Sequence, residues 1–214
     1  MNYKNIFCIS LFVILAISCS SSNSLLKPDT DDLIKSAPQK FNVVFETTKG
    51  TFTIEVDREN SPLAVDRFFY LVNNSYYDGN RFFRVVPKFV VQWGMKGIPK
   101  IDSTWENMGI KDEPVKLSNT KGTIAFARSG PNTRSNQLYI NLEDNVRLDS
   151  SKYNNVNGFP AFGKVINGMN VIESINSEYE QNPDQDSIMA KGNNYLNKNF
   201  PNLDYIISTN ILTK

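Results

Sequence analysis

The chain has 214 residues, which is enough for one domain with a sizeable hydrophobic core and too few for two ordinary domains. Hydrophobic residues make up 40% of the sequence, as in globular proteins, and a formal net charge of only +1 argues against nucleic acid as a partner. The sequence contains no histidine, which excludes imidazole acid–base catalysis, Ser-His-Asp and Cys-His nucleophiles, and histidine-ligated zinc.

Residues 1–18 have the layout of a secretory signal peptide. The apolar run Ile6–Ile17 is too short to span a bilayer. Its end, Leu15-Ala16-Ile17-Ser18-Cys19, resembles the lipobox of bacterial lipoproteins, in which the cysteine becomes the lipidated amino terminus. This resemblance implies an exported protein held to a bacterial membrane through lipid on Cys19, facing the periplasm or on the outer membrane. The alternative is an ordinary signal peptide that happens to contain a cysteine.

The other cysteine, Cys8, lies inside the leader and would leave with it. The mature chain would then keep no thiol for a disulfide, a metal or a nucleophile. Residues 19–40 are polar and lack helical or strand periodicity, so they are predicted to form the lipidated amino terminus and a flexible tether. Residues 41–214 are predicted to form the folded domain.

The domain is expected to open with a hairpin and a helix. Residues 41–47 and 51–56 alternate in polarity around Thr48-Lys49-Gly50, which predicts two antiparallel strands. Ser61 followed by Pro62 predicts a helix start, with an end near Asn73. Further short apolar runs predict strands at 82–86, 89–93, 123–127, 137–141, 161–166 and 205–211, and helices are predicted at 169–175 and 184–198. Many short strands with few helices favour a barrel or a sandwich.

Three segments stand out from this pattern. In the first, YDGNRFFRVVPKFVVQ from Tyr77 to Gln92, Arg84 and Gln92 interrupt apolar strands. The second, GTIAFARSGPNTRSNQLYI at 122–140, joins two strands by a polar loop, and the third is FGKVINGM at 162–169. An isolated arginine or glutamine of this kind is more often a surface residue.

Taken together and in this order, the segments resemble the signature of the cyclophilin-type peptidyl-prolyl cis/trans isomerases. The matching motifs are Tyr-Asp-Gly, Phe-x-Arg-Val-x-Pro-x-Phe-x-x-Gln, Gly-Pro-Asn-Thr ahead of Ser-x-Gln, and Phe-Gly-Lys-Val-x-x-Gly-Met. The resemblance spans about residues 41–175. It implies a mainly β fold, a closed eight-stranded antiparallel barrel with capping helices. It also implies an isomerase of proline-containing polypeptides that needs no metal or other cofactor.

The resemblance implies roles for individual residues. Arg84 would donate to the prolyl nitrogen, and Gln92 would orient Arg84 and the substrate carbonyl. The residues implied to bind the substrate are Phe89, Val90, Ala127, Arg128, Gln137, Tyr139, Leu148 and Phe159. Considered alone, each apolar member of this set would more often be a core residue. Its place within the family motif is the reason to assign it to the substrate pocket.

The sequence departs from the family pattern around the pocket. Arg147 stands where the eukaryotic pattern has tryptophan, which implies weak binding of cyclosporin-like ligands. Phe159 stands where that pattern has histidine, after a polar insertion at 150–158, and Tyr139 replaces the usual phenylalanine.

Three functions are compatible with these motifs. The first is an active isomerase that assists the folding of exported or envelope proteins, and the presence of both Arg84 and Gln92 favours it. The second is a non-catalytic chaperone or scaffold module on the membrane that binds proline-containing segments. The third is a structural envelope lipoprotein that retains only the fold. A monomer is expected, because no apolar stripe is left over for a second copy.

Overall fold

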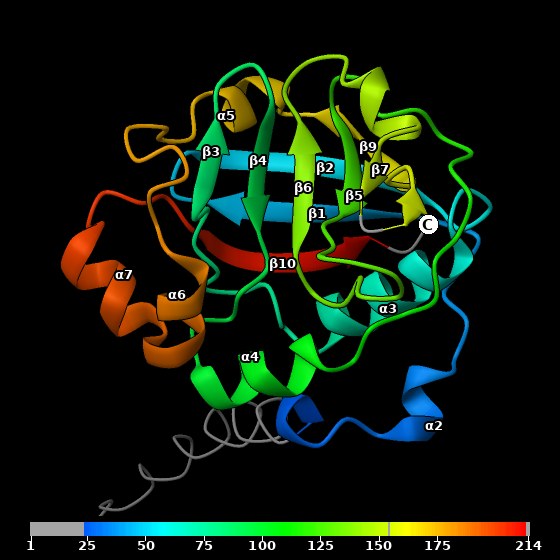
Figure 1. The fold of residues 1–214 in the computed structure, drawn as a ribbon, viewed down its shortest axis with the longest axis horizontal. Coiled ribbons are helices and arrows are strands. Elements are labelled where there is room, and N and C mark those ends of the chain that lie inside the picture. The colour runs from blue at the N-terminus through cyan, green and yellow to red at the C-terminus, as the bar shows by residue number, and fades with distance from the viewer. Residues whose placement is uncertain (1–23, 154, 213–214) are drawn as a thin grey trace, which may run out of the picture.

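An antiparallel sheet of eight strands forms the centre of the molecule (Figure 1). The computed structural model describes residues 24–153 and 155–212. The strand order is β10-β1-β2-β9-β5-β6-β4-β3. The strands are β1 (Lys40–Thr47), β2 (Gly50–Asp57), β3 (Arg84–Val86), β4 (Val90–Trp93), β5 (Thr123–Phe126), β6 (Leu138–Asn141), β9 (Ala161–Asn167) and β10 (Ile206–Leu212).

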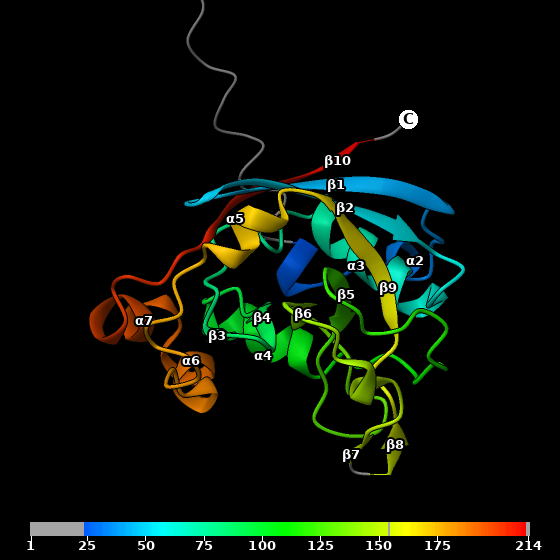
Figure 2. The same cartoon turned by 90° about the horizontal axis from the view of Figure 1, so that it is seen from above.

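The sheet curls around a hydrophobic core. Strands β10, β1 and β2 form one layer, β3 to β6 form the other, and β9 runs between them (Figure 2). Because side chains alternate between the two faces of a strand, every second residue points into the space between the layers. Aromatic side chains fill that space. They include Phe45 and Phe52, whose rings stack at 4.8 Å, and the fully buried Phe68, Trp93 and Phe162.

Short helices surround the curled sheet (Figure 1). They are α2 (Thr30–Leu33), α3 (Pro62–Asn73), α4 (Pro99–Glu106), the 3-10 helix η1 (Val146–Asp149), α5 (Met169–Glu173), α6 (Gln185–Lys191) and α7 (Asn193–Asn199). A small hairpin of β7 (Lys152–Tyr153) and β8 (Val156–Asn157) projects from the sheet (Figure 2). Helices α3 and α5 lie near opposite ends of the curled sheet, so they separate much of the core from solvent.

The sheet is an open half-barrel, which corrects the closed barrel expected from the sequence. Its edge strands β3 and β10 share no ladder, and the described residues join the two edges only through a bridge between Arg81 and Tyr205 and its neighbouring hydrogen bonds. The reason lies in β3, which is only three residues long. The N–H of Val85 donates to the carbonyl of Glu180 at 2.9 Å, so a loop before α6 occupies the edge that β10 would need.

The single helix predicted at 184–198 is two helices, α6 and α7, divided at Gly192. This glycine has φ +60°, and a Cβ there would stand 2.2 Å from the carbonyl oxygen of Gly97. The N–H of Asn193 donates to the same carbonyl at 2.9 Å. The close approach of two backbone segments therefore requires glycine and breaks the helix.

A flexible tether is predicted for residues 19–40, and within the described part of this segment Leu25 and Ala37 contact the domain. From residue 24 onward the chain is described, and Leu25 is only 2% exposed. The indole N–H of Trp105 donates to the Leu25 carbonyl at 2.9 Å, and the N–H of Ala37 donates to Asp66 at 2.8 Å. Two adjacent leucines are too short a pattern to reveal such an anchor from the sequence.

The predicted signal peptide and Cys19 lie outside the described residues. In the part of the chain that the structure describes, no helix combines the length and the apolar character needed to cross a bilayer.

Candidate active site

The layer formed by β3 to β6 carries a pocket on its outer face. On β6, Leu138 and Ile140 belong to the main core, whereas Tyr139 between them belongs to a separate cluster with Val90 and Ala125. The same alternation on β4 and β5 turns one set of side chains inward and the other outward. The sheet thus places a second apolar cluster on its outer surface, where a ligand can reach it.

The pocket has a volume of about 380 Å³ and gathers residues from distant parts of the chain. It is lined by Arg84, Phe89, Val90, Gln92, Ala127, Arg128, Tyr139, Leu148, Phe159 and Gln185. The structure therefore brings together nearly all of the site residues implied by the sequence. Gln137 is the exception, because it lines a neighbouring cavity instead. Its side chain nevertheless contacts the pocket through Gln92.

Arg84 is held in place by a glutamine pair. Strands β3 and β4 pair so that Arg84 stands opposite Gln92, and Nη1 of Arg84 donates to Oε1 of Gln92 at 3.1 Å. Nε2 of Gln92 in turn donates to Oε1 of Gln137 at 2.8 Å. The guanidinium carbon of Arg84 lies 5.5 Å from the ring centre of Phe89.

The positive charge of Arg84 is not neutralised by a neighbouring carboxylate in the described part of the chain. Partial burial lowers the pKa of Arg84, but an arginine stays charged at neutral pH. Among the described residues, Arg84 forms no salt bridge. A cationic donor therefore faces an apolar pocket without a carboxylate to neutralise it.

The floor of the pocket depends on Asn119, which the sequence analysis missed. Its Oδ1 accepts from the Tyr139 hydroxyl at 2.9 Å, and its Nδ2 donates both to the Phe159 carbonyl and to Asp149, each at 2.8 Å. Burial raises the pKa of Tyr139 far above its usual range, so its hydroxyl stays protonated and donates. No motif points to Asn119, because its role follows from contacts between distant segments.

Two arginines lie over rings of the pocket, and each contact includes one departure from the family pattern, Arg147 in the first and Phe159 in the second. The guanidinium carbon of Arg147 lies 4.9 Å from the ring centre of Phe89, and that of Arg128 lies 4.6 Å from the ring centre of Phe159. Arg128 also contacts Asp112 at 3.4 Å and donates to the Gly158 carbonyl. The insertion at 150–158 includes the β7–β8 hairpin and returns the chain so that Phe159 enters the pocket.

Gln185 is a second lining residue that the sequence analysis missed. It begins α6, far along the chain from the family motifs, and its side chain is exposed at the rim of the pocket. The described residues hold no group of three or more acidic or cysteine side chains that could bind a metal ion.

Comparison with known proteins identifies the family of the chain. Residues 42–193 match the family model of the cyclophilin type peptidyl-prolyl cis-trans isomerases. A peptidyl-prolyl cis-trans isomerase of Acinetobacter baylyi is 37% identical over 136 residues, which cover 62% of this chain and 70% of that protein. Peptidyl-prolyl cis-trans isomerase A of Dickeya dadantii is 33% identical over 150 residues, 69% of this chain and 77% of that protein.

Solved structures show the same fold. A cyclophilin type peptidyl-prolyl cis-trans isomerase of Cryptosporidium parvum matches with a TM-score of 0.59 and 19% identity, covering 82% of this chain and 99% of that one. A structure of the same protein in the presence of the dipeptide Ala-Pro matches with a TM-score of 0.58 and 20% identity, covering 81% of this chain and 99% of that one. The chain belongs to the cyclophilin-type peptidyl-prolyl cis-trans isomerase family. The enzyme class predicted from the sequence, an isomerase, is confirmed.

Proposed function

We propose that this chain isomerises X-Pro bonds in exported or envelope polypeptides, with Arg84 as the donor to the prolyl nitrogen. The observation that carries the proposal is the uncompensated Arg84 guanidinium, held by Gln92 at an apolar pocket on the outside of the sheet. The Ala-Pro dipeptide named with the Cryptosporidium structure supports a proline-containing peptide as the ligand.

The reaction suits such a site because it needs no nucleophile. Rotation about an X-Pro bond has a barrier of roughly 20 kcal/mol, since resonance gives the amide C–N bond double-bond character. As the bond twists, the nitrogen lone pair becomes localised and accepts a hydrogen bond that the planar amide accepts poorly. A donor aimed at that nitrogen therefore binds the twisted state more tightly than the ground state, which is the condition for catalysis.

The required energy is modest. To raise the spontaneous rate of about 0.01 per second to about 10 per second, the enzyme must lower the barrier by roughly 4 kcal/mol. A hydrogen bond from a charged donor contributes about 1.5–3 kcal/mol. The rings of Phe89, Tyr139 and Phe159 supply the rest by holding the proline ring and excluding water while the preceding carbonyl turns.

The test is the rate of isomerisation of a short X-Pro peptide, measured by NMR exchange with the chain from Ser20 onward. Arg84→Ala should remove most of the acceleration while circular dichroism and thermal unfolding show an intact fold. Arg81→Ala is the matched control, because Arg81 lies three residues earlier, stacks on Tyr205 and lines none of the pockets described above. A folded wild-type chain that binds the peptide without accelerating it would favour the chaperone or scaffold alternative.

We also propose that the mature protein is anchored to a membrane through lipid on Cys19. The lipobox-like sequence from Leu15 to Cys19 supports this. Mass spectrometry of the protein from the membrane fraction of a bacterial host should show acyl chains on Cys19, and Cys19→Ser should release the protein into the soluble fraction. An unmodified wild-type Cys19 would contradict the anchor and leave the isomerase proposal untouched.

A further inference from the structure

A second cavity adjoins the proline pocket. It has a volume of about 480 Å³ and shares Gln92, Ala127, Arg128 and Gln185 with that pocket. Because the two hollows have these four residues in common, a polypeptide bound with its proline in the first can continue into the second. What the second cavity accepts therefore bears directly on substrate choice.

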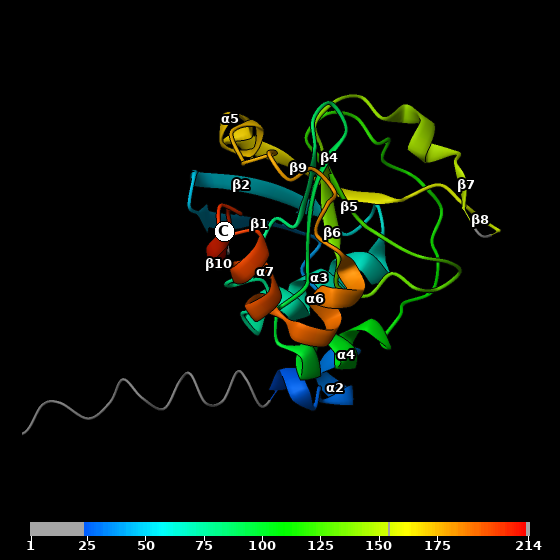
Figure 3. The same ribbon diagram turned by 60° about the vertical axis from the view of Figure 1, so that its left-hand side comes forward.

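Helix α6 forms one wall of this cavity and is fixed in position. Ile188 on its inner side is fully buried in a cluster with Phe83 and Met95. At its end, Gly192 fits closely against Gly97, and α6 contacts α4 (Figure 3). The wall is therefore preformed, and its position does not depend on a ligand.

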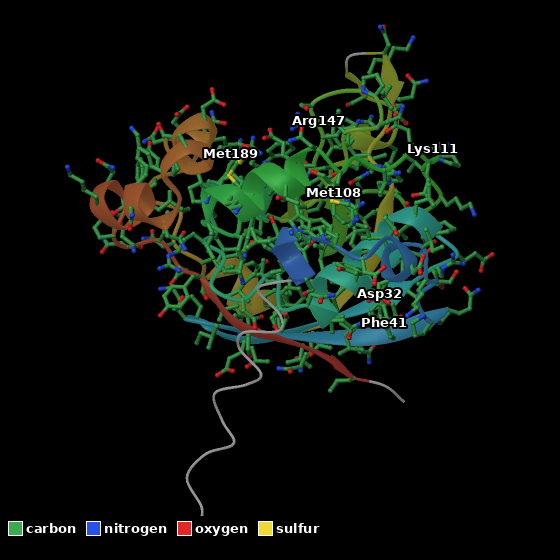
Figure 4. All side chains as sticks on the ribbon, turned by 90° about the horizontal axis from the view of Figure 1, so that it is seen from below. Asp32, Phe41, Met108, Lys111, Arg147 and Met189 are labelled. Carbon is green, nitrogen blue, oxygen red and sulfur yellow. The ribbon has the colours of Figure 1, made fainter. Side chains whose placement is uncertain are left out.

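The other side of α6 presents three residues to the hollows. Gln185 and Met189 are four positions apart, so they share one face of the helix, and Asp186 stands beside them. Met189 lies on the side of α6 that faces α4 (Figure 4). Across the cavity, the end of α4 contributes Glu106.

The charged residues that line the cavity leave an excess of negative charge, because two carboxylates stand against one arginine. Glu106 and Asp186 are exposed and form no salt bridge with any described residue. The cation in the lining, Arg128, is already held by Asp112 and the Gly158 carbonyl. Met95 and Met189 also line the cavity and add apolar surface to it. An aliphatic stem that ends in a positive charge matches this combination, because the stem packs on the methionines while the charge stays near the carboxylates.

We propose that α6 is a wall of the substrate groove and that the second cavity takes a lysine or arginine side chain from the same polypeptide whose proline occupies the first pocket. This inference rests on the proposed isomerase function. It makes Asp186 and Glu106 specificity-determining residues, and it assigns to the carboxyl-terminal part of the chain a role in choosing the substrate.

The experiment uses the full-length chain and a series of short peptides around one X-Pro bond. Each peptide carries a single lysine at a different position, and its partner carries norleucine there, which has an aliphatic stem of similar length without the charge. At one position, kcat/KM for the lysine peptide should exceed that for the norleucine peptide by about threefold to tenfold, and added salt should reduce the ratio. In the Glu106→Gln/Asp186→Asn variant the ratio should fall towards one.

The matched control is Glu55→Gln/Glu143→Gln, which removes the same charge from exposed residues that line neither cavity. This control should keep the lysine preference. A ratio near one at every position, or a preference that survives the Glu106→Gln/Asp186→Asn change, would overturn the inference.

Placement is tested separately by NMR of methionine methyl groups. Titration with the preferred lysine peptide should shift the Met189 and Met95 signals and leave Met169, beside Gly122, unchanged. An unmoved Met189 signal on peptide binding would overturn the wall assigned to α6. The norleucine peptides decide the proposed function independently, because a wild-type chain that accelerates none of them contradicts isomerase activity rather than the position of α6.

Discussion

The side chain of Gln92 accepts a hydrogen bond from Arg84 and, through its other end, donates one to Gln137. These two hydrogen bonds fix which atom of the Gln92 amide faces the arginine. Oε1 must accept from Nη1 of Arg84, while Nε2 donates to Oε1 of Gln137. Gln92 is therefore a positioning residue for Arg84. Its own strand pairing, opposite both Arg84 and Tyr139, sets its distance from the pocket.

Replacing Gln92 should lower turnover more than it weakens binding. In Gln92→Met, the Arg84 guanidinium loses its hydrogen-bond partner while the side-chain volume stays similar. The expected result is a fall in kcat of about tenfold, which corresponds to roughly 1.4 kcal/mol, with a smaller change in KM. The comparison is Gln137→Met, which keeps the Arg84–Gln92 contact and should cost less. An equal loss of kcat in both variants would argue against the positioning role.

Glu113 should contribute strongly to the stability of the fold. Its Oε2 accepts from the Ser61 hydroxyl at 2.5 Å and from Nη2 of the fully buried Arg134 at 3.0 Å, and its Oε1 accepts from the N–H of Leu63 at 2.9 Å. Glu113→Gln removes the nearer of the two carboxylates around a buried guanidinium, the other being Asp112 at 4.0 Å, so it should lower the free energy of unfolding by about 3 kcal/mol. Urea denaturation measures this, and Glu143→Gln on the surface should change it by less than about 0.5 kcal/mol.

The same pair can be tested by a double-mutant cycle. Arg134→Met alone leaves the largely enclosed Glu113 carboxylate without its arginine partner, whereas the double variant removes both charges. The loss of stability in Glu113→Gln/Arg134→Met should therefore be smaller than the sum of the two single losses. Additive losses would mean that the two side chains stabilise the fold independently.

Asp102 should make stability depend on pH in the acidic range. Its oxygens accept from the N–H groups of Lys96 and Gly97 at 2.5 and 2.8 Å, and burial raises its pKa to about 6 from an ordinary value of 3.8. The folded state thus binds the proton more tightly than the unfolded chain. Stability from this group is fully present below about pH 4 and is lost as the pH rises through 6.

The measurement is the difference in free energy of unfolding between the wild type and Asp102→Asn. Carboxyl groups whose pKa is lowered in the folded state, such as Asp57 and Asp149, change stability with pH in the opposite direction. They are present in both proteins, so their effects cancel in the difference. From pH 4 to pH 7 this difference should fall by about 2–3 kcal/mol. A difference that stays constant across this range would show that Asp102 titrates normally.

The hydroxyl of Tyr139 should stabilise the pocket floor. It donates to Asn119 at 2.9 Å in a buried hydrogen bond, so Tyr139→Phe removes that bond while the ring remains. The free energy of unfolding should fall by about 1 kcal/mol. Because burial raises the pKa of Tyr139, its phenol should also stay protonated in alkaline solution until the chain unfolds. Ultraviolet titration of the wild type against Tyr139→Phe checks the second point.

The sequence predicts those parts of the fold that depend on local pattern. The hairpin of β1 and β2 follows from period-two alternation, and the start of α3 follows from Ser61 and Pro62. The reason for that start differs from the expected one, since the Ser61 side chain makes no capping bond and Glu113 accepts from the first turn instead. A cap supplied from 50 residues away has no local signal.

The site residues also fall into those that sequence motifs predict and those that only the folded structure reveals. Family motifs place Arg84, Gln92 and most of the pocket, because these residues sit on strands with fixed register. Asn119 and Gln185 were missed because each reaches the pocket from outside those motifs. Helix α4 was missed because Asp102 and polar neighbours interrupt its apolar face, although that carboxylate is buried and bound by backbone N–H groups.

The docked amino-terminal segment sets a limit on reach. Because the Leu25 carbonyl is bound by Trp105, only the five residues 20–24 lie between the predicted lipid at Cys19 and a fixed point on the domain. The six steps along the backbone from Cys19 to Leu25 span at most about 22 Å when fully extended. If Cys19 carries the lipid as proposed, the catalytic domain cannot range over the space around it. It would diffuse in two dimensions with the membrane and encounter chains within a shallow layer above the surface.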